Sequence, residues 1–194
     1  MIHDGSGSIT DNQSALDTLL LGNRVFLETL EQTERQENER DLVAQVVFSN
    51  GAYVLSYFRD DYQSLIKKME LLDWHSPPLG GGTDAGSALL SALQLTLKKN
   101  SYVGGHQYSP AETKALMARI RGFGELKLHD ALEAKTAAIK DELSGYVFVL
   151  FTDGVFNMSF DPTFIAPAKI IGLCQKLGIK IYVFYFAYFY LRIF

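Results

Sequence analysis

The chain has 194 residues, of which 47% are hydrophobic and 21% charged, and a net charge of −4. This length and composition are typical of one globular domain with a substantial buried core. The acidic balance gives no support for a nucleic-acid-binding surface, and a single cysteine, Cys174, excludes an internal disulfide.

The first residues predict the end of a buried strand followed by a polar loop. Met1–His3 precede an Asp-x-Ser-x-Ser run at residues 4–8. Strands usually have about five or six residues, so we expect the chain to be a fragment that begins inside its central strand. His3 is interpreted as a strand residue, because imidazole fits a hard-oxygen metal site poorly.

A long helix and a hairpin are expected next. Apolar residues at spacings of three and four predict a helix from Ile9 to about Leu30, with Asp11 or Thr10 as its cap. After a charged stretch, two β-rich runs at 42–48 and 52–58 flank Asn50-Gly51, which is a strong hairpin signal. The second run is expected to be an antiparallel edge strand.

The rest of the chain alternates helices and strands. We expect helices at 60–72, 84–97 and 162–177, strands at 146–151 and 179–187, and a mostly helical insertion at about 100–145. The apolar tail at 188–194 is too short and too punctuated by charge to span a bilayer. Together these elements predict an α/β fold: a doubly wound, mostly parallel sheet with one antiparallel edge strand and helices on both faces, in a single domain over 1–194.

Three loops carry hard oxygen ligands. The Asp-x-Ser-x-Ser run is joined by a threonine after a glycine run and by an aspartate in Thr152-Asp153-Gly154. Hydroxyl and carboxylate oxygens suit Mg²⁺, or Mn²⁺ or Ca²⁺, rather than zinc or copper. In a doubly wound sheet the loops after the first and fourth strands meet at the switch point. The predicted metal ligands are therefore Asp4, Ser6, Ser8, Thr83 and Asp153.

These motifs resemble those of the von Willebrand factor type A family, which includes the integrin inserted domain. The resemblance runs from Ile2 to about Leu97 and again from Tyr146 to Ala187, with both ends of the domain cut short. It implies a metal-ion-dependent adhesion site in which the hydroxyls bind the ion directly and the aspartates act largely through water. A partner protein's Glu or Asp would complete the shell. Family members often have asparagine where this chain has Asp84, so an added negative charge is expected to tighten metal binding and weaken attraction for an acidic partner.

The expected function is therefore metal-dependent protein binding in cell adhesion or the extracellular matrix, without catalysis, nucleic-acid binding or a membrane span. We expect the chain to belong to a longer secreted or extracellular protein. One alternative is an intracellular scaffold subunit of an ATPase assembly. Another is a nucleotide-binding enzyme that uses the Gly80–Thr83 loop, although Asp84 would repel phosphate and no Gly-Lys-Ser/Thr loop is present.

Overall fold

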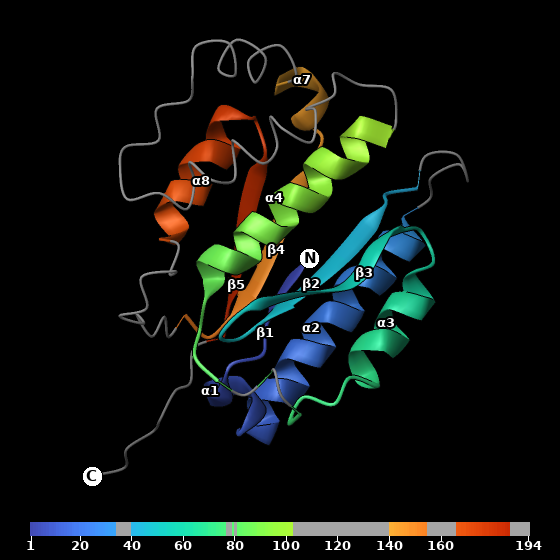
Figure 1. The fold of residues 1–194 in the computed structure, drawn as a ribbon. Helices are drawn as coiled ribbons and strands as arrows, with labels where there is room; N and C mark the ends of the chain where they lie inside the picture. Colours follow the sequence, from blue (N-terminus) through green and yellow to red (C-terminus); the bar gives the residue numbers. More distant parts are fainter. Residues whose placement is uncertain (34–39, 77–78, 80, 103–139, 155–165, 187–194) are drawn as a thin grey trace.

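The computed structural model describes residues 1–33, 40–76, 79, 81–102, 140–154 and 166–186. These residues form a five-stranded sheet between two layers of helices (Figure 1). In chain order the elements are β1 (Ile2–Asp4), α1 (Gly7–Thr10), α2 (Gln13–Gln32), β2 (Val43–Phe48), β3 (Ala52–Arg59), α3 (Tyr62–Glu70), α4 (Ala85–Tyr102), α7 (Lys140–Leu143), β4 (Val147–Thr152), α8 (Pro167–Lys176) and β5 (Lys180–Tyr185).

The strand order is β3-β2-β1-β4-β5, and β2 with β3 is the antiparallel pair of this sheet. Strand β1 pairs in parallel with β2 on one side and with β4 on the other. The chain thus winds outward from β1 in one direction, then returns to place β4 against its other side. The predicted doubly wound α/β fold with an antiparallel edge strand is confirmed.

The two faces of the sheet have separate cores, because successive strand residues point to opposite sides. On one face Phe48 and Leu150 pack beneath α4 and α8. On the other face Val47 and Phe151 pack against α2 and the end of α3. All six residues of β2 are buried, as expected for a strand covered on both faces.

The helix expected from Ile9 to Leu30 is instead two helices. Helix α1 ends at Thr10, and α2 begins at Gln13. Asn12 caps α2 by accepting a hydrogen bond of 3.3 Å from the backbone N–H of Ala15. The predicted caps are therefore wrong, because the side chain of Thr10 is turned back and donates to the carbonyl of Ser6.

Other boundaries shift by a few residues. Helix α4 continues to Tyr102, beyond the predicted end at Leu97, and the described part of α8 begins at Pro167. Most of the expected insertion, at 103–139, and the tail at 187–194 lie outside the described residues. In the parts of the chain that the structure covers, no helix is long and apolar enough to cross a membrane.

Candidate metal site at the carboxyl edge of the sheet

The predicted ligands gather where β1 and β4 end. His3 pairs with Phe151 in the sheet, so the residues that follow each of them leave the same edge side by side. Asp4 ends β1, and Asp153 comes directly after β4. Burial raises the pKa of Asp4, and charge repulsion from the nearby Asp153 adds to that shift. The fold therefore brings together aspartates from opposite ends of the chain.

The glycine-rich loop before α4 joins the same edge through backbone hydrogen bonds. The N–H of Gly7 donates to the carbonyl of Gly81 at 3.1 Å, which ties this loop to the Asp-x-Ser-x-Ser loop. The N–H of Asp84 donates to the carbonyl of Ser49 at 2.7 Å. These two bonds hold Thr83, which lies between them in sequence, beside the ends of β1 and β2.

Asp4 is fully buried and held by two protein donors. Its Oδ1 accepts from the backbone N–H of Ser6 at 2.9 Å, and its Oδ2 accepts from Oγ1 of Thr152 at 2.6 Å. Burial raises the pKa of Asp4 above its ordinary value, and these hydrogen bonds oppose that shift. A bound cation would favour the charged form of this carboxyl group.

The two serine hydroxyls of the Asp-x-Ser-x-Ser loop lie next to each other. Oγ of Ser6 lies 3.1 Å from Oγ of Ser8. Ser6 is the N-cap residue of α1, yet its side chain makes no capping hydrogen bond, and Ser8 lies inside α1. Helix capping therefore does not account for either hydroxyl.

Thr83 provides an orphaned oxygen. The residue is 3% exposed, and its Oγ1 atom is buried without a hydrogen-bond partner among the described residues. A buried hydroxyl without a partner costs free energy. This position therefore favours a ligand that accepts a hydrogen bond from the hydroxyl or is coordinated by its oxygen. A divalent ion or its bound water is such a ligand.

Both carboxylate oxygens of Asp84 accept hydrogen bonds from a residue of its own helix. Its Oδ1 accepts from the backbone N–H of Ser87 at 2.9 Å, and its Oδ2 accepts from the hydroxyl of Ser87 at 2.6 Å. These are the contacts of a residue that caps the first turn of α4. The carboxylate is thus already bound to donors within its own helix.

Two contributions were not predicted from the sequence. Thr152 donates to Asp4, and its Oγ1 also accepts from the N–H of Gly154 at 3.0 Å, so it connects the two aspartate loops. Asn50 accepts from the N–H of Gly82 with its side-chain oxygen, which fixes the glycine-rich loop against the hairpin. A Cβ at residue 81 would overlap the Asn50 side chain, so a larger residue there would displace Asn50 from the loop. The Thr-Asp-Gly and Asn-Gly motifs single out Thr152 and Asn50 in the sequence. The hydrogen-bond partners of these two residues, however, are distant in sequence.

The donor set fits a hard divalent cation. Within the described ranges no group of three His, Cys, Asp or Glu residues could hold a metal ion, so any site here depends on hydroxyls as well as on its two carboxylates. Two carboxylates formally balance a divalent charge, and hydroxyl oxygens suit Mg²⁺, Mn²⁺ or Ca²⁺. His3 is excluded as a ligand, because it is buried in β1 with its ring stacked on Phe151 at 5.1 Å between centroids.

The fold is von Willebrand factor type A-like. No family model and no curated protein sequence matches the chain. Among solved structures, BatB from Bacteroides thetaiotaomicron matches with a TM-score of 0.51 and 16% identity over 94% of this chain and 62% of that one. An aerotolerance-related membrane protein from Bacteroides fragilis matches with a TM-score of 0.50 and 18% identity over 94% and 63%.

A third match is proximal thread matrix protein 1 from the mussel byssus, in a structure with a zinc-occupied MIDAS motif. Its TM-score is 0.52 and its identity 17%, over 94% of this chain and 36% of that one. The chain thus spans about three-fifths of the length of the two Bacteroides proteins and about a third of the mussel protein. At these identities the likeness establishes the fold alone.

Proposed function

We propose that this chain is a metal-ion-dependent protein-binding domain. Asp4, Ser6, Ser8, Thr83 and Asp153 would hold one divalent ion, and a Glu or Asp side chain of a partner protein would complete its shell. The observation that carries the proposal is the buried hydroxyl of Thr83, which has no partner in the described parts of the chain and lies on a loop that is hydrogen-bonded to the Asp-x-Ser-x-Ser loop. The zinc-occupied MIDAS motif of the mussel matrix protein shows that a protein of similar fold holds a divalent ion, which supports the proposal.

The chemistry follows from charge and coordination number. An octahedral ion bound to a few protein oxygens keeps water at its remaining positions. The hydroxyls contribute dipoles without charge, so an anionic group from outside can replace a water favourably. Mg²⁺ is the first candidate, with Mn²⁺ and Ca²⁺ as alternatives. We propose binding rather than catalysis, because the carboxylates and hydroxyls gathered here are the ligands of a hard divalent ion.

The setting of the domain is part of the proposal. A secreted or extracellular setting is favoured by the adhesion chemistry, and the similar mussel protein is a thread matrix protein by name. An intracellular scaffold would use the same site on a different partner. The nucleotide-binding alternative is disfavoured, because the N–H of Gly82, one of the groups that would cradle phosphate, already donates to Asn50, and the Asp84 carboxylate beside the loop would repel phosphate.

The metal site is tested by titrating Mg²⁺ and Mn²⁺ into the wild type, Thr83→Ala and Asp153→Ala, with calorimetry and thermal melts. The wild type should bind one ion and melt at a higher temperature, and both variants should lose most of the affinity. Asp60→Ala is the matched control, since Asp60 is exposed and follows β3 at the opposite edge of the sheet. Equal binding by all four proteins would overturn the site.

Partner recognition is tested separately on the metal-loaded protein. A surface displaying peptides that contain Glu should retain the wild type in Mg²⁺ and release it in EDTA. The same peptides with Gln in place of Glu should retain neither the wild type nor Asp153→Ala. Retention that is indifferent to EDTA would refute the carboxylate-bridging mechanism while leaving metal binding intact.

A further inference from the structure

A second candidate surface lies at the outer edge of the sheet, on strand β3. In the strand order β3 has β2 on one side, and none of the described strands pairs with its other side (Figure 1). The strand is eight residues long, and from Ala52 to Phe58 it contains neither proline nor a charged residue. Proteins usually protect a sheet edge with charges, proline or a very short strand. This edge lacks those three protections and is suited to pairing with another strand.

A groove of about 640 Å³ runs beside this edge, between β3 and α3. Leu55 contributes to it from β3, Lys67 and Lys68 contribute from α3, and Leu71 and Leu72 contribute from the residues that follow α3. The groove therefore combines apolar side chains with two positive charges. Nothing in the proposed metal chemistry uses these residues.

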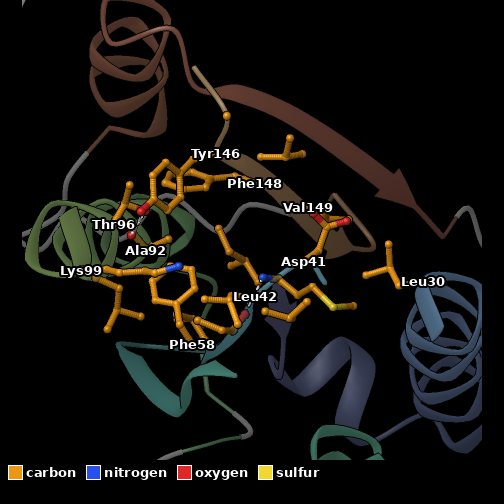
Figure 2. A pocket seen from close by; sticks show the side chains of 18 of the residues that line it. Leu30, Asp41, Leu42, Phe58, Ala92, Thr96, Lys99, Tyr146, Phe148 and Val149 are labelled. Atoms are coloured by element: carbon orange, nitrogen blue, oxygen red, sulfur yellow. Dashed lines mark hydrogen bonds between the residues drawn. The ribbon is translucent and has the colours of Figure 1, made fainter. Parts of the chain in front are cut away.

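The side chains of β3 alternate between the two faces of the sheet. Phe58 packs on the α4 face, where the ammonium group of Lys99 lies 4.7 Å from its ring centre (Figure 2). Tyr53 and Leu55 point to the other face, since Tyr53 pairs with a core residue of that face and Leu55 packs against the same core. On this face Tyr53 is 40% exposed and Leu71 is 83% exposed. A strand added to the edge would cover both side chains.

The direction of α3 orders the groove along its length. Ile66 clusters with Val43 near the end of β3, whereas Met69 clusters with Val47 near its start, so α3 runs antiparallel to β3. A strand antiparallel to β3 therefore passes the two lysines before it reaches the two leucines. One helical turn advances about 5.4 Å, and two strand residues advance about 6.8 Å. An acidic residue followed two positions later by an apolar residue matches this order and spacing.

The charge of the groove favours an acidic occupant. Lys67 and Lys68 line its middle, and the ion pair found among the described residues involves neither of them. The acidic residue of the lining, Asp61, is the N-cap of α3 and accepts from the backbone N–H of Ser64 at 3.0 Å. Its carboxylate is therefore bound to the first turn of the helix, whereas the lysines lie in the last turn. A carboxylate on a bound segment would be attracted to the lysines.

We propose that this groove binds an extended segment of a partner protein that pairs antiparallel with β3. The segment places an acidic residue against Lys67 and Lys68 and, two positions later, an apolar residue against Leu71 and Leu72. Main-chain hydrogen bonds along the edge supply affinity, and the alternate side chains in the groove supply specificity. A second copy of this chain fits less well, because its own β3 would bring no acidic residue from 52–58 to the lysines.

The test uses an acetylated Thr-Val-Thr-Glu-Thr-Ile-Thr peptide, in EDTA so that its carboxylate cannot act through a metal ion. Calorimetry should show saturable binding, and amide exchange should become slower in β3. The same peptide with Lys in place of Glu should bind at least about fivefold more weakly, as expected for the loss of two ion pairs. A fully N-methylated peptide cannot donate hydrogen bonds to the edge and should not bind.

A charge exchange identifies the lysines as the residues that recognise the peptide. Lys67→Glu combined with Lys68→Glu should weaken binding of the Glu peptide and strengthen binding of the Lys peptide. Lys180→Glu is the matched control, since this exposed lysine begins β5 at the other side of the sheet, and it should change neither affinity. Leu71→Ser is a second variant at an exposed position, and it should weaken binding while leaving the melting temperature unchanged.

The proposal is overturned if the Lys peptide or the N-methylated peptide binds the wild type as tightly as the Glu peptide does, or if the charge exchange has no effect. A lysine-dependent dimer in ultracentrifugation, without peptide binding, would instead assign the groove to a second copy. Lysine-dependent capture by phosphatidylserine vesicles, again without peptide binding, would assign it to a membrane surface. Because every measurement is made in EDTA, failure here leaves the proposed metal site untouched.

Discussion

The hydroxyl of Thr152 donates a 2.6 Å hydrogen bond to Oδ2 of Asp4, across 148 positions of the chain. The same oxygen accepts from the N–H of Gly154, so one side chain fixes both the first and the last loop of the candidate metal site. Glycine is needed at 154, where φ is +74° and a Cβ would strike the Tyr185 ring. Thr152 is therefore a positioning residue for the site rather than a ligand.

Removal of this hydroxyl should weaken metal binding without removing a ligand. Thr152→Val keeps the shape of the side chain but leaves Oδ2 of Asp4 without its donor. Groups that orient metal ligands typically contribute about 10- to 100-fold to affinity, so we expect a loss of that order for Mn²⁺ by calorimetry. Thr152→Ser keeps the donor and should bind nearly as the wild type does. Equal affinity in Thr152→Val and wild type would contradict the positioning role.

His3 should make the metal-free protein less stable below neutral pH. Burial, reinforced by the positive Met1 amino group, lowers the pKa of His3 well below 6.5. In the unfolded chain His3 binds a proton near pH 6.5, whereas in the folded chain it remains neutral at that pH. Folding stability is therefore lost as pH falls below that value. His3 contributes a slope of up to about 1.4 kcal/mol per pH unit, and the Met1 amino group, whose pKa burial lowers from 8.0 to about 5, adds a slope of the same sign.

The measurement is the free energy of unfolding from urea titrations in EDTA between pH 5 and 8. His3→Phe should have a flatter profile than the wild type, and it should be at least as stable near pH 7, because neither ring nitrogen of His3 has a hydrogen-bond partner among the described residues. His75→Gln, at an exposed position, should keep the wild-type slope. Parallel profiles for His3→Phe and wild type would rule out the effect.

Removing one member of the buried Asn23–Gln45 pair should cost more folding stability than replacing both members by apolar residues. Nε2 of Gln45 donates to Oδ1 of Asn23 at 3.0 Å, and both side chains are almost fully buried between α2 and β2. Asn23→Leu leaves the Gln45 amide without this partner and should cost about 1–3 kcal/mol of stability. Asn23→Leu with Gln45→Leu should cost less than that single change. Additive losses in a double-mutant cycle would show that the two residues are not coupled.

The sequence was sufficient for the elements of the sheet, because hydrophobic period and turn chemistry are local, and the doubly wound topology then predicts the strand order. The two runs around Asn50-Gly51 form the predicted hairpin, but residue 51 does not have positive φ, so the turn differs from the usual Asn-Gly type. Asn50 instead uses its side chain to hold the glycine-rich loop. The Asn-Gly motif therefore predicts where the turn lies. The conformation of the turn depends on its contact with a loop that is distant in sequence.

Some parts of the candidate site could likewise be predicted from the sequence, and others could not. The motifs indicate Asp4, Ser6 and Ser8 because they share one short loop, and the doubly wound topology brings Asp153 beside them. The role of Thr152 could not be predicted, since it depends on the side-by-side exit of β1 and β4. The break between α1 and α2 was also missed, because Thr10, Asp11 and Asn12 are all residue types that cap helices, and in the structure Thr10 bonds back to Ser6 while Asn12 caps α2.

Asp84 should affect the stability of α4 more than the affinity for metal. The sequence suggested that its charge acts on the ion, but both carboxylate oxygens accept hydrogen bonds from Ser87. Asp84→Ala removes this cap and should cost about 1 kcal/mol of unfolding free energy in EDTA, whereas Asp84→Asn retains capping ability and should cost less. Calorimetric affinities for Mg²⁺ should differ by less than about threefold among Asp84→Ala, Asp84→Asn and wild type, since the charge is already satisfied within its helix. A tenfold drop in both variants, with stability unchanged, would instead place the carboxylate in direct interaction with the ion.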